Sequence, residues 1–191
     1  MDTLEALLSR ESVSARYLME PAPSAEHRRQ AYEAAMRAPD HGAIRPWRIM
    51  EFEGAGLERL SDVYYEAAKR AEPNSDPAVW ETAKAKALRS PLLLGITAVV
   101  REDHPKVPVI EQVVAAGCAA QVLLTAFHAQ GYGAVMVTGA RAYDPYVKQA
   151  LGLEDKDHIV GFIHLGTPQT DRPPAGKSRP VVEDHVTSWG L

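Results

Sequence analysis

The apolar and polar positions of this chain follow two spacings, one typical of helices and one typical of strands. Apolar residues at helical spacing predict helices over about 2–10, 24–38, 57–71, 76–90, 109–130 and 144–152. Alternating or continuous apolar stretches predict strands at 47–53, 91–100, 134–139 and 158–166. Helices outnumber strands and the two types are mixed along the chain, which predicts an α+β fold.

Several of the predicted helices begin at a side chain that can accept hydrogen bonds from the first turn. Asp2, Ser24, Asp76 and Asp144 occupy such capping positions, and a proline follows both Asp76 and Asp144. Gly131 supplies a carboxyl-terminal cap for the longest helix. After Gly166 the chain is rich in proline, so regular structure is not expected there.

Between Gln112 and Ala140 the sequence has no Asp, Glu, Lys or Arg. Polar residues such as Gln121 and His128 interrupt this stretch, and it falls short of the ~20 apolar residues that cross a bilayer. We therefore expect it to be buried in protein and not in a membrane. Its run of small residues, VVAAGCAA, would let a second helix approach closely. A helix this apolar is unsuited to the surface of a small monomer.

Composition narrows the functional classes. The 191 residues are 46% hydrophobic and 24% charged, which predicts one globular domain over 1–191. The net charge of −4 argues against a nucleic-acid partner. Cys118 is the single cysteine, so no intrachain disulfide can form, and the N-terminal sequence does not resemble a signal peptide. A cytoplasmic location is the expectation.

Two nucleotide-binding motifs are present only in part. GYGAVM, at 131–136, lacks the third glycine of a dinucleotide fingerprint and leads from helix to strand, the reverse of the required order. GKS, at 176–178, ends like a phosphate-binding loop, but Asp171 stands where its first glycine belongs. Neither a Rossmann site nor a nucleotide triphosphatase is expected.

Metal-assisted and covalent catalysis also lack suitable residues. No two histidines have the spacing of metal ligands on one helix face, and Glu154 with His158 is only a loose pair across a loop. No serine lies in a nucleophile elbow, and Cys118 lies among alanines in mid-helix, where a thiol is usually inert. We expect no metal site and no catalytic nucleophile.

Two polar clusters remain as candidate sites. Residues 10–16, RESVSAR, combine guanidinium and hydroxyl groups that could bind a phosphate dianion. The alternative is that Arg10 only offsets the dipole of the first helix. Residues 37–47, RAPDHGAIRPW, form a stiff loop that could present polar groups to a planar ligand. A solvated turn with a buried Trp47 would explain this second cluster equally well.

These clusters, with several later segments, resemble the nitroreductase family of flavoproteins. The likeness covers essentially the whole chain: RES at residue 10, MRAPDH followed by PW, KVP before the longest helix, AQGYGA, DHIVGF at 157–162, and LGTP. It implies a nitroreductase-like α/β sandwich, with a central antiparallel or mixed sheet flanked by helices. It also implies an interlocked homodimer with FMN in each of two clefts between the chains. The tail, 167–191, would then be docked on the partner chain.

The resemblance also implies roles for particular residues. Arg10 and Ser12 would hold the FMN phosphate and ribityl chain, and Glu11 would contribute through its backbone. Arg37 and His41 would reach the flavin from the partner chain. The flavin ring would lie along the strand after Gly131, against Met136, Val137 and Thr138. A basic pair near the phosphate would be Lys177 and Arg179.

Two positions depart from the family pattern. Relatives usually carry a second arginine at the position of Glu11, and larger members often carry a lysine at that of Ser14. Both changes remove positive charge near the flavin, so we expect the anionic reduced form to be less favoured and the reduction potential to be lower.

The function implied is electron transfer from NADH or NADPH, through bound FMN, to a nitroaromatic, a quinone or another electron-poor acceptor. The reaction would proceed in two steps at one site, with the chemistry on the flavin and no catalytic side chain. Two alternatives stay open. One is an FMN-binding protein for storage, sensing or another flavin reaction, with little nicotinamide turnover; the other is a dimeric interaction protein with an empty cleft.

Overall fold

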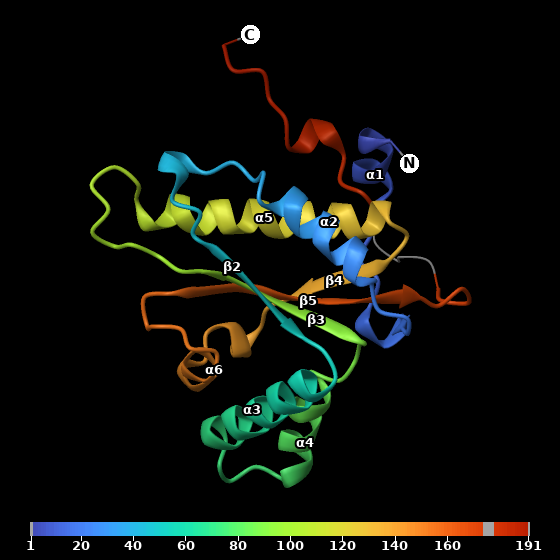
Figure 1. Ribbon diagram of the computed structural model, residues 1–191, viewed down its shortest axis with the longest axis vertical. Coiled ribbons are helices and arrows are strands. Elements are labelled where there is room, and N and C mark those ends of the chain that lie inside the picture. The colour runs from blue at the N-terminus through green and yellow to red at the C-terminus, as the bar shows by residue number, and fades with distance from the viewer. Residues whose placement is uncertain (1, 174–177, 191) are drawn as a thin grey trace.

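The computed structural model describes residues 2–173 and 178–190, which form an antiparallel sheet between two layers of helices (Figure 1). The strand order is β2-β3-β5-β4. His164 of β5 pairs with Leu93 of β3 and also with Val135 of β4, so β5 lies between those two strands. A short strand, β1, pairs with the last residues of β5. The strands are β1 (Leu18–Met19), β2 (Trp47–Phe52), β3 (Leu92–Ala98), β4 (Gly133–Val137) and β5 (His158–Pro168).

The helices cover both faces of the sheet. Figure 1 shows α2 (Ala25–Ala35) and α5 (Val109–Ala129) on one face. On the other face lie α3 (Ala55–Ala71), α4 (Pro77–Ala85) and α6 (Pro145–Ala150). The first helix, α1 (Thr3–Ser9), contacts α5. The α+β prediction is confirmed, and all strand pairings between neighbours are antiparallel.

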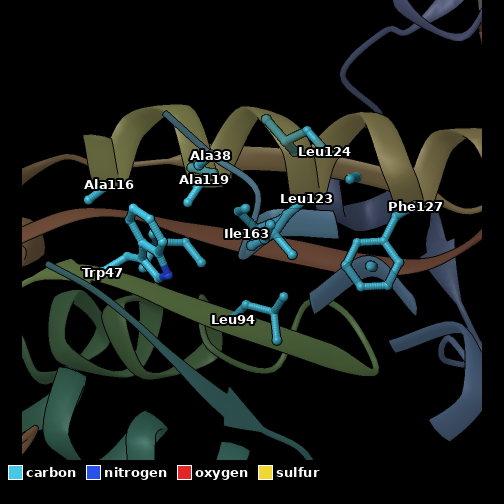
Figure 2. Packing of buried hydrophobic residues seen from close by; sticks show 14 of the residues in the cluster. Ala38, Trp47, Leu94, Ala116, Ala119, Leu123, Leu124, Phe127 and Ile163 are labelled. Carbon is cyan, nitrogen blue, oxygen red and sulfur yellow. The ribbon is translucent and has the colours of Figure 1, made fainter. Parts of the chain in front are cut away.

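Burial of β3 explains its uninterrupted apolar sequence. All seven of its residues are buried, because helices cover both faces of the sheet. Leu92 and Leu94 pack into the core beneath α2 and α5, whereas Leu93 packs into the core beside α3 and α6. Figure 2 shows the first of these cores, in which Leu123 and Phe127 of α5 point toward the sheet.

The small residues of α5 allow close packing within the chain. Ala116 and Ala119 face the sheet, and Ala31 and Ala35 of α2 are buried in the same core. The predicted close helix pair is therefore α2 with α5. By length and composition α5 could also cross a membrane, but its buried residues pack against the sheet of its own chain.

The largest differences from the prediction are at the end of α4, at β1 and at the end of β5. We expected a helix to Ser90, but α4 ends at Ala85. Lys86, Ala87 and Leu88 follow it in tighter turns, each with a backbone hydrogen bond to the third residue back. The strand β1 has two residues, too few to give a pattern. The last strand continues beyond Gly166 to Pro168 because β1 extends its pairing.

The described part of the tail lies outside both cores. Its 3-10 turn, Val182–Asp184, is exposed, and Figure 1 shows the segment leaving the layers near α1. Val182 and Val186 are 64% and 66% exposed, and Trp189 is 99% exposed. Apolar side chains this exposed suit a segment that packs on another chain. Docking on a partner stays a prediction.

Candidate functional site

The segment that follows α1 lies directly against β4. The Val13 amide donates a 2.9 Å hydrogen bond to the Ala134 carbonyl, and the Val13 side chain is buried. A Cβ at Gly133 would lie only 2.6 Å from Leu18 Cδ2, so glycine is needed for this approach. Side chains alternate along an extended segment, so Ser12 and Ser14 are exposed on the side opposite Val13.

Beside this segment lies a half-open cavity of about 370 Å³. Two serines, three basic side chains and a histidine line it, together with valines of β4. The lining includes Ser12, Ser14, Lys86, Arg89, Val135, Val137, Arg141 and His164. The cavity therefore lies between the segment after α1, the turn before β3, the strands β4 and β5, and the turn after β4.

Positive charge dominates this cavity. Within residues 2–173 and 178–190, none of Lys86, Arg89 and Arg141 forms an ion pair. Burial, with repulsion from Arg141 and Arg89, lowers the pKa of Lys86. Burial also lowers the pKa of Arg141, and Arg89 adds to the effect. Cations grouped without counter-ions favour an anionic ligand.

His164 is the neutral member of the cavity wall. Burial first, and then the charges of Arg141 and Arg89, lower the pKa of its ring to about 4. The Ser90 hydroxyl lies 2.7 Å from His164 Nδ1 and 3.0 Å from the Leu92 carbonyl. A hydroxyl has one proton, and the Leu92 carbonyl can only accept. His164 Nδ1 therefore donates to Ser90, which leaves Nε2 as an acceptor.

The end of the chain returns to the Arg10 segment. The Arg179 guanidinium donates to the Arg10 carbonyl, and Arg172 pairs with the Glu11 carboxylate. Arg172 thus offsets the negative charge of Glu11, the residue at which this chain differs from the arginine of its relatives. Arg10 is half-buried at the end of α1. Lys177 lies outside the described residues.

Arg37 and His41 lie far from this cavity. His41 Nδ1 is 2.6 Å from Glu111 Oε2 in the first turn of α5, and Arg37 is exposed after α2. Arg10 lies at the other end of α5, where Ser9 is hydrogen-bonded to His128. Seventeen residues separate Glu111 from His128, which corresponds to about 25 Å of helix. One chain therefore does not bring the two predicted clusters together.

The three predicted residues at the end of β4 differ in direction. Val137 lines the cavity with Val135. Met136 alternates to the opposite face, where it lies over Gly161 and is 39% exposed. Thr138 is exposed just beyond the strand. Only Val137 can contact a ligand in this cavity through its side chain.

Sequence analysis missed Lys86, Arg89, Arg141 and His164. The first two lie in KALRS, directly before the buried strand β3, and Arg141 follows Gly139 at the end of β4. Basic residues at both of these strand ends were a signal that could have been used. His164 lies within the last predicted strand, where no motif or spacing marks it as a site residue.

A wider groove of about 1230 Å³ lies beside α6 but has different chemistry. Its basic groups are already engaged: Arg70 lies 4.1 Å from the centre of the Tyr146 ring, and Lys156 is 3.0 Å from Glu154. The smaller cavity, with its uncompensated charge, is the better candidate site.

The likeness to known proteins extends over most of the chain. The nitroreductase family model matches residues 7–167. Over 169 residues the chain is 42% identical to YdjA of Escherichia coli (strain K12), which is named as an NAD(P)H nitroreductase; the match spans 88% of this chain and 90% of YdjA. The chain belongs to the nitroreductase family.

Solved structures of nitroreductases have the same fold. A nitroreductase-like protein from Bacillus cereus matches 100% of this chain, and 97% of its own, with a TM-score of 0.81 and 22% identity. A nitroreductase from Desulfovibrio desulfuricans, solved in complex with FMN, matches 98% of this chain and 97% of its own, with a TM-score of 0.72 and 20% identity. The nitroreductase-like fold predicted from the sequence is thus confirmed.

Proposed function

We propose that this nitroreductase family member is an FMN-dependent oxidoreductase. It takes electrons from NADH or NADPH and passes them to small electron-poor acceptors such as nitroaromatics or quinones. The observation that carries this proposal is the cationic cavity, which adjoins the segment after α1 and has no carboxylate partner among the described residues. The name of YdjA and the FMN complex of the Desulfovibrio relative support it.

The residues present fit the two ends of FMN. The phosphate needs cationic donors, which Arg10 supplies at the end of α1 and Arg179 beside it. The polar edge of the ring needs donors and positive charge, which the basic wall of the cavity supplies. Ser12, on the segment between these places, is exposed and can bond the ribityl chain.

FMN held in this cavity would supply the redox chemistry, which is hydride transfer from NAD(P)H followed by two-electron transfer to the acceptor. The protein needs no nucleophile or acid–base residue for these steps. Its own residues bind the phosphate, orient the ring against β4 and set the local electrostatics. The donor and then the acceptor would enter the same half-open cavity in turn, which would give a two-step reaction.

We further propose that two chains share each site. His41 lies about one length of α5, ~25 Å, from the Arg10 segment in one chain, so His41 and the loop that carries Arg37 would reach a flavin only from a second copy. Exposed apolar residues support an interface on α5, where Ile110 is 67% and Val114 is 57% exposed. The tail with Trp189 would pack on the partner.

Colour and reduction test this function. Purified protein should be yellow from bound FMN and should bleach without oxygen when NADH or NADPH is added. Yellow protein that stays oxidised would support the storage or sensing alternative. Colourless protein that cannot be reconstituted with FMN would overturn both, leaving an interaction protein.

A binding variant sharpens that test. Arg10→Ala should weaken FMN affinity about tenfold or more, because a charge-assisted contact to phosphate is lost. Its free energy of unfolding without FMN should change by less than about 1 kcal/mol. Arg16→Ala, at an exposed arginine in the same segment that lies over the Tyr17 ring, is the control and should keep FMN affinity. If Arg10→Ala lowers the free energy of unfolding as much as the free energy of FMN binding, Arg10 only offsets the dipole of α1 and does not bind the phosphate.

A further inference from the structure

The three cations of the cavity differ in how exposed they are and in how firmly their side chains are held. Arg89 is exposed, so water and salt screen its charge, and Lys86 is half-buried on a flexible stem. Arg141 is half-buried in the turn Ala140–Ala142. Its guanidinium lies 4.6 Å from the centre of the Tyr64 ring, and Tyr64 itself is only 2% exposed. Arg141 is therefore the best-fixed charge in the cavity.

The surroundings of Arg141 leave that charge uncompensated. Among the described residues Arg141 has no carboxylate partner, and the ring beneath it is neutral. The other ionisable groups of the cavity wall are Lys86 and Arg89, which repel Arg141, and His164, which is neutral. A negative charge in the cavity would relieve this repulsion.

We propose that Arg141 stabilises the negative charge that the flavin ring acquires on reduction. The inference rests on the proposed FMN site. A hydride brings two electrons and one proton from NAD(P)H, which becomes NAD(P)⁺, and the ring gains one negative charge because no second proton follows. A fixed cation beside the ring binds the reduced form more tightly than the neutral oxidised form.

This role reverses an expectation from the sequence. Glu11 and Ser14 remove positive charge relative to other family members, which predicts a low reduction potential. In the structure Arg172 offsets Glu11, and Arg141 brings a cation to the wall that Ser14 also lines. The charge is supplied from the turn after β4 and not from the segment after α1.

The test compares the affinities for reduced and oxidised FMN. Arg141→Met removes the charge but keeps an unbranched side chain that can pack on the Tyr64 ring. The ratio of the two affinities should fall about tenfold, equivalent to a midpoint potential lower by ~30 mV for a two-electron couple. Arg141→Lys keeps the charge and should recover most of the ratio.

A matched control is available on the same face of the sheet. Arg70 lies over the Tyr146 ring much as Arg141 lies over Tyr64, but it belongs to the groove beside α6. Arg70→Met should leave the ratio unchanged. An unchanged ratio in Arg141→Met would overturn the proposal, and so would unfolding of both Arg141→Met and Arg141→Gln, which would make the residue structural.

A second readout needs no flavin. In apoprotein, NMR titration should show that Arg141→Met raises the pKa of the His164 ring, because a repelling charge is gone. If the pKa of the His164 ring is the same in the variant and the wild type, the charge of Arg141 does not act on groups in the cavity wall. That result would overturn the inference. Failure of the wild type to bind FMN would instead refute the proposed function, so the two failures are distinguishable.

Discussion

Among single residues, His164 shows most directly how burial sets protonation. Its ring is 5% exposed and lies near two guanidinium groups, so both the environment and the neighbouring charges disfavour the imidazolium form. The hydrogen bond with Ser90 is compatible with the neutral ring. The folded state therefore holds His164 neutral in a pH range where the unfolded chain protonates it.

This difference predicts an acid-sensitive stability. The pKa of His164 is about 4 when folded and near 6.5 when unfolded, so the folded state binds fewer protons between these values. Stability from this residue is complete above about pH 6.5 and is lost as pH falls toward 4, by roughly 3 kcal/mol in all. Urea unfolding at pH 7 and pH 4 measures the loss.

The control for this prediction replaces the imidazole of His164 by a side chain that does not titrate. His164→Gln keeps a side-chain donor for Ser90 but has no proton to take up. Its free energy of unfolding should fall less between pH 7 and pH 4, and the difference from wild type should be roughly 3 kcal/mol. Equal pH dependence in the two proteins would show that His164 is not the group responsible.

The sequence predicted two residues of the cavity, Ser12 and Val137, and both came from the family resemblance. Ser12 and Val137 do line one cavity, as their proposed shared ligand requires. Arg141 and His164 were missed because their chemistry depends on each other, and 23 residues of sequence, including α6, separate them. Pattern alone does not place a guanidinium beside a buried ring.

At the scale of elements, Arg28 connects α2 to the sheet through ion pairs with Glu51 of β2 and with Glu53 directly after it. Arg28 donates to both oxygens of Glu53, at 2.9 and 2.5 Å, and also to the Pro23 carbonyl at 2.7 Å. The side chain of Arg28 is only 15% exposed. Its hydrogen bonds hold the pKa of the Glu53 carboxyl below its usual range.

The bidentate contact between the Arg28 guanidinium and the Glu53 carboxylate predicts that lysine cannot replace Arg28 without a loss of stability. Lysine carries the charge but not the planar fork, so Arg28→Lys should cost about 1–2 kcal/mol in the free energy of unfolding. The neighbouring Arg29→Lys is a matched control, because Arg29 is 76% exposed and makes one pair with Glu33. That change should cost less than about 0.5 kcal/mol. Similar costs for both would show that the fork at Arg28 adds no stability.

Elements were predictable where periodicity and caps agree. Asp2, Ser24, Asp76 and Asp144 all cap helices as expected, each accepting a backbone hydrogen bond. The predicted end of α4 was wrong because the helix gives way to tighter turns after Ala85, and β1 was not predicted because two residues give no pattern. A two-residue strand exists only by pairing with β5.

Across the whole molecule, the arrangement of α5 links fold to function. The helix separates the Arg10 segment from His41, and its outward face keeps Ile110 and Val114 exposed. His41 and Cys118 lie with these two residues along one shallow groove of about 250 Å³. A second copy on this face would cover the apolar groups and would bring the Arg37 loop to the other chain's cavity.

A charge on that face should therefore separate the chains and release the flavin. Wild type should have twice the 20.9 kDa chain mass by light scattering, whereas Val114→Glu should shift toward one chain mass. FMN should be lost with the dimer, because Arg37 and His41 would no longer reach the partner's site. Val79→Glu is the control, since Val79 is also a half-exposed helix valine, at 45%, but lies on α4 away from the face. A monomeric wild type that retains FMN would refute the shared site, as would a monomeric Val114→Glu with full FMN content. A dimeric Val114→Glu would refute the assignment of the interface to this face of α5.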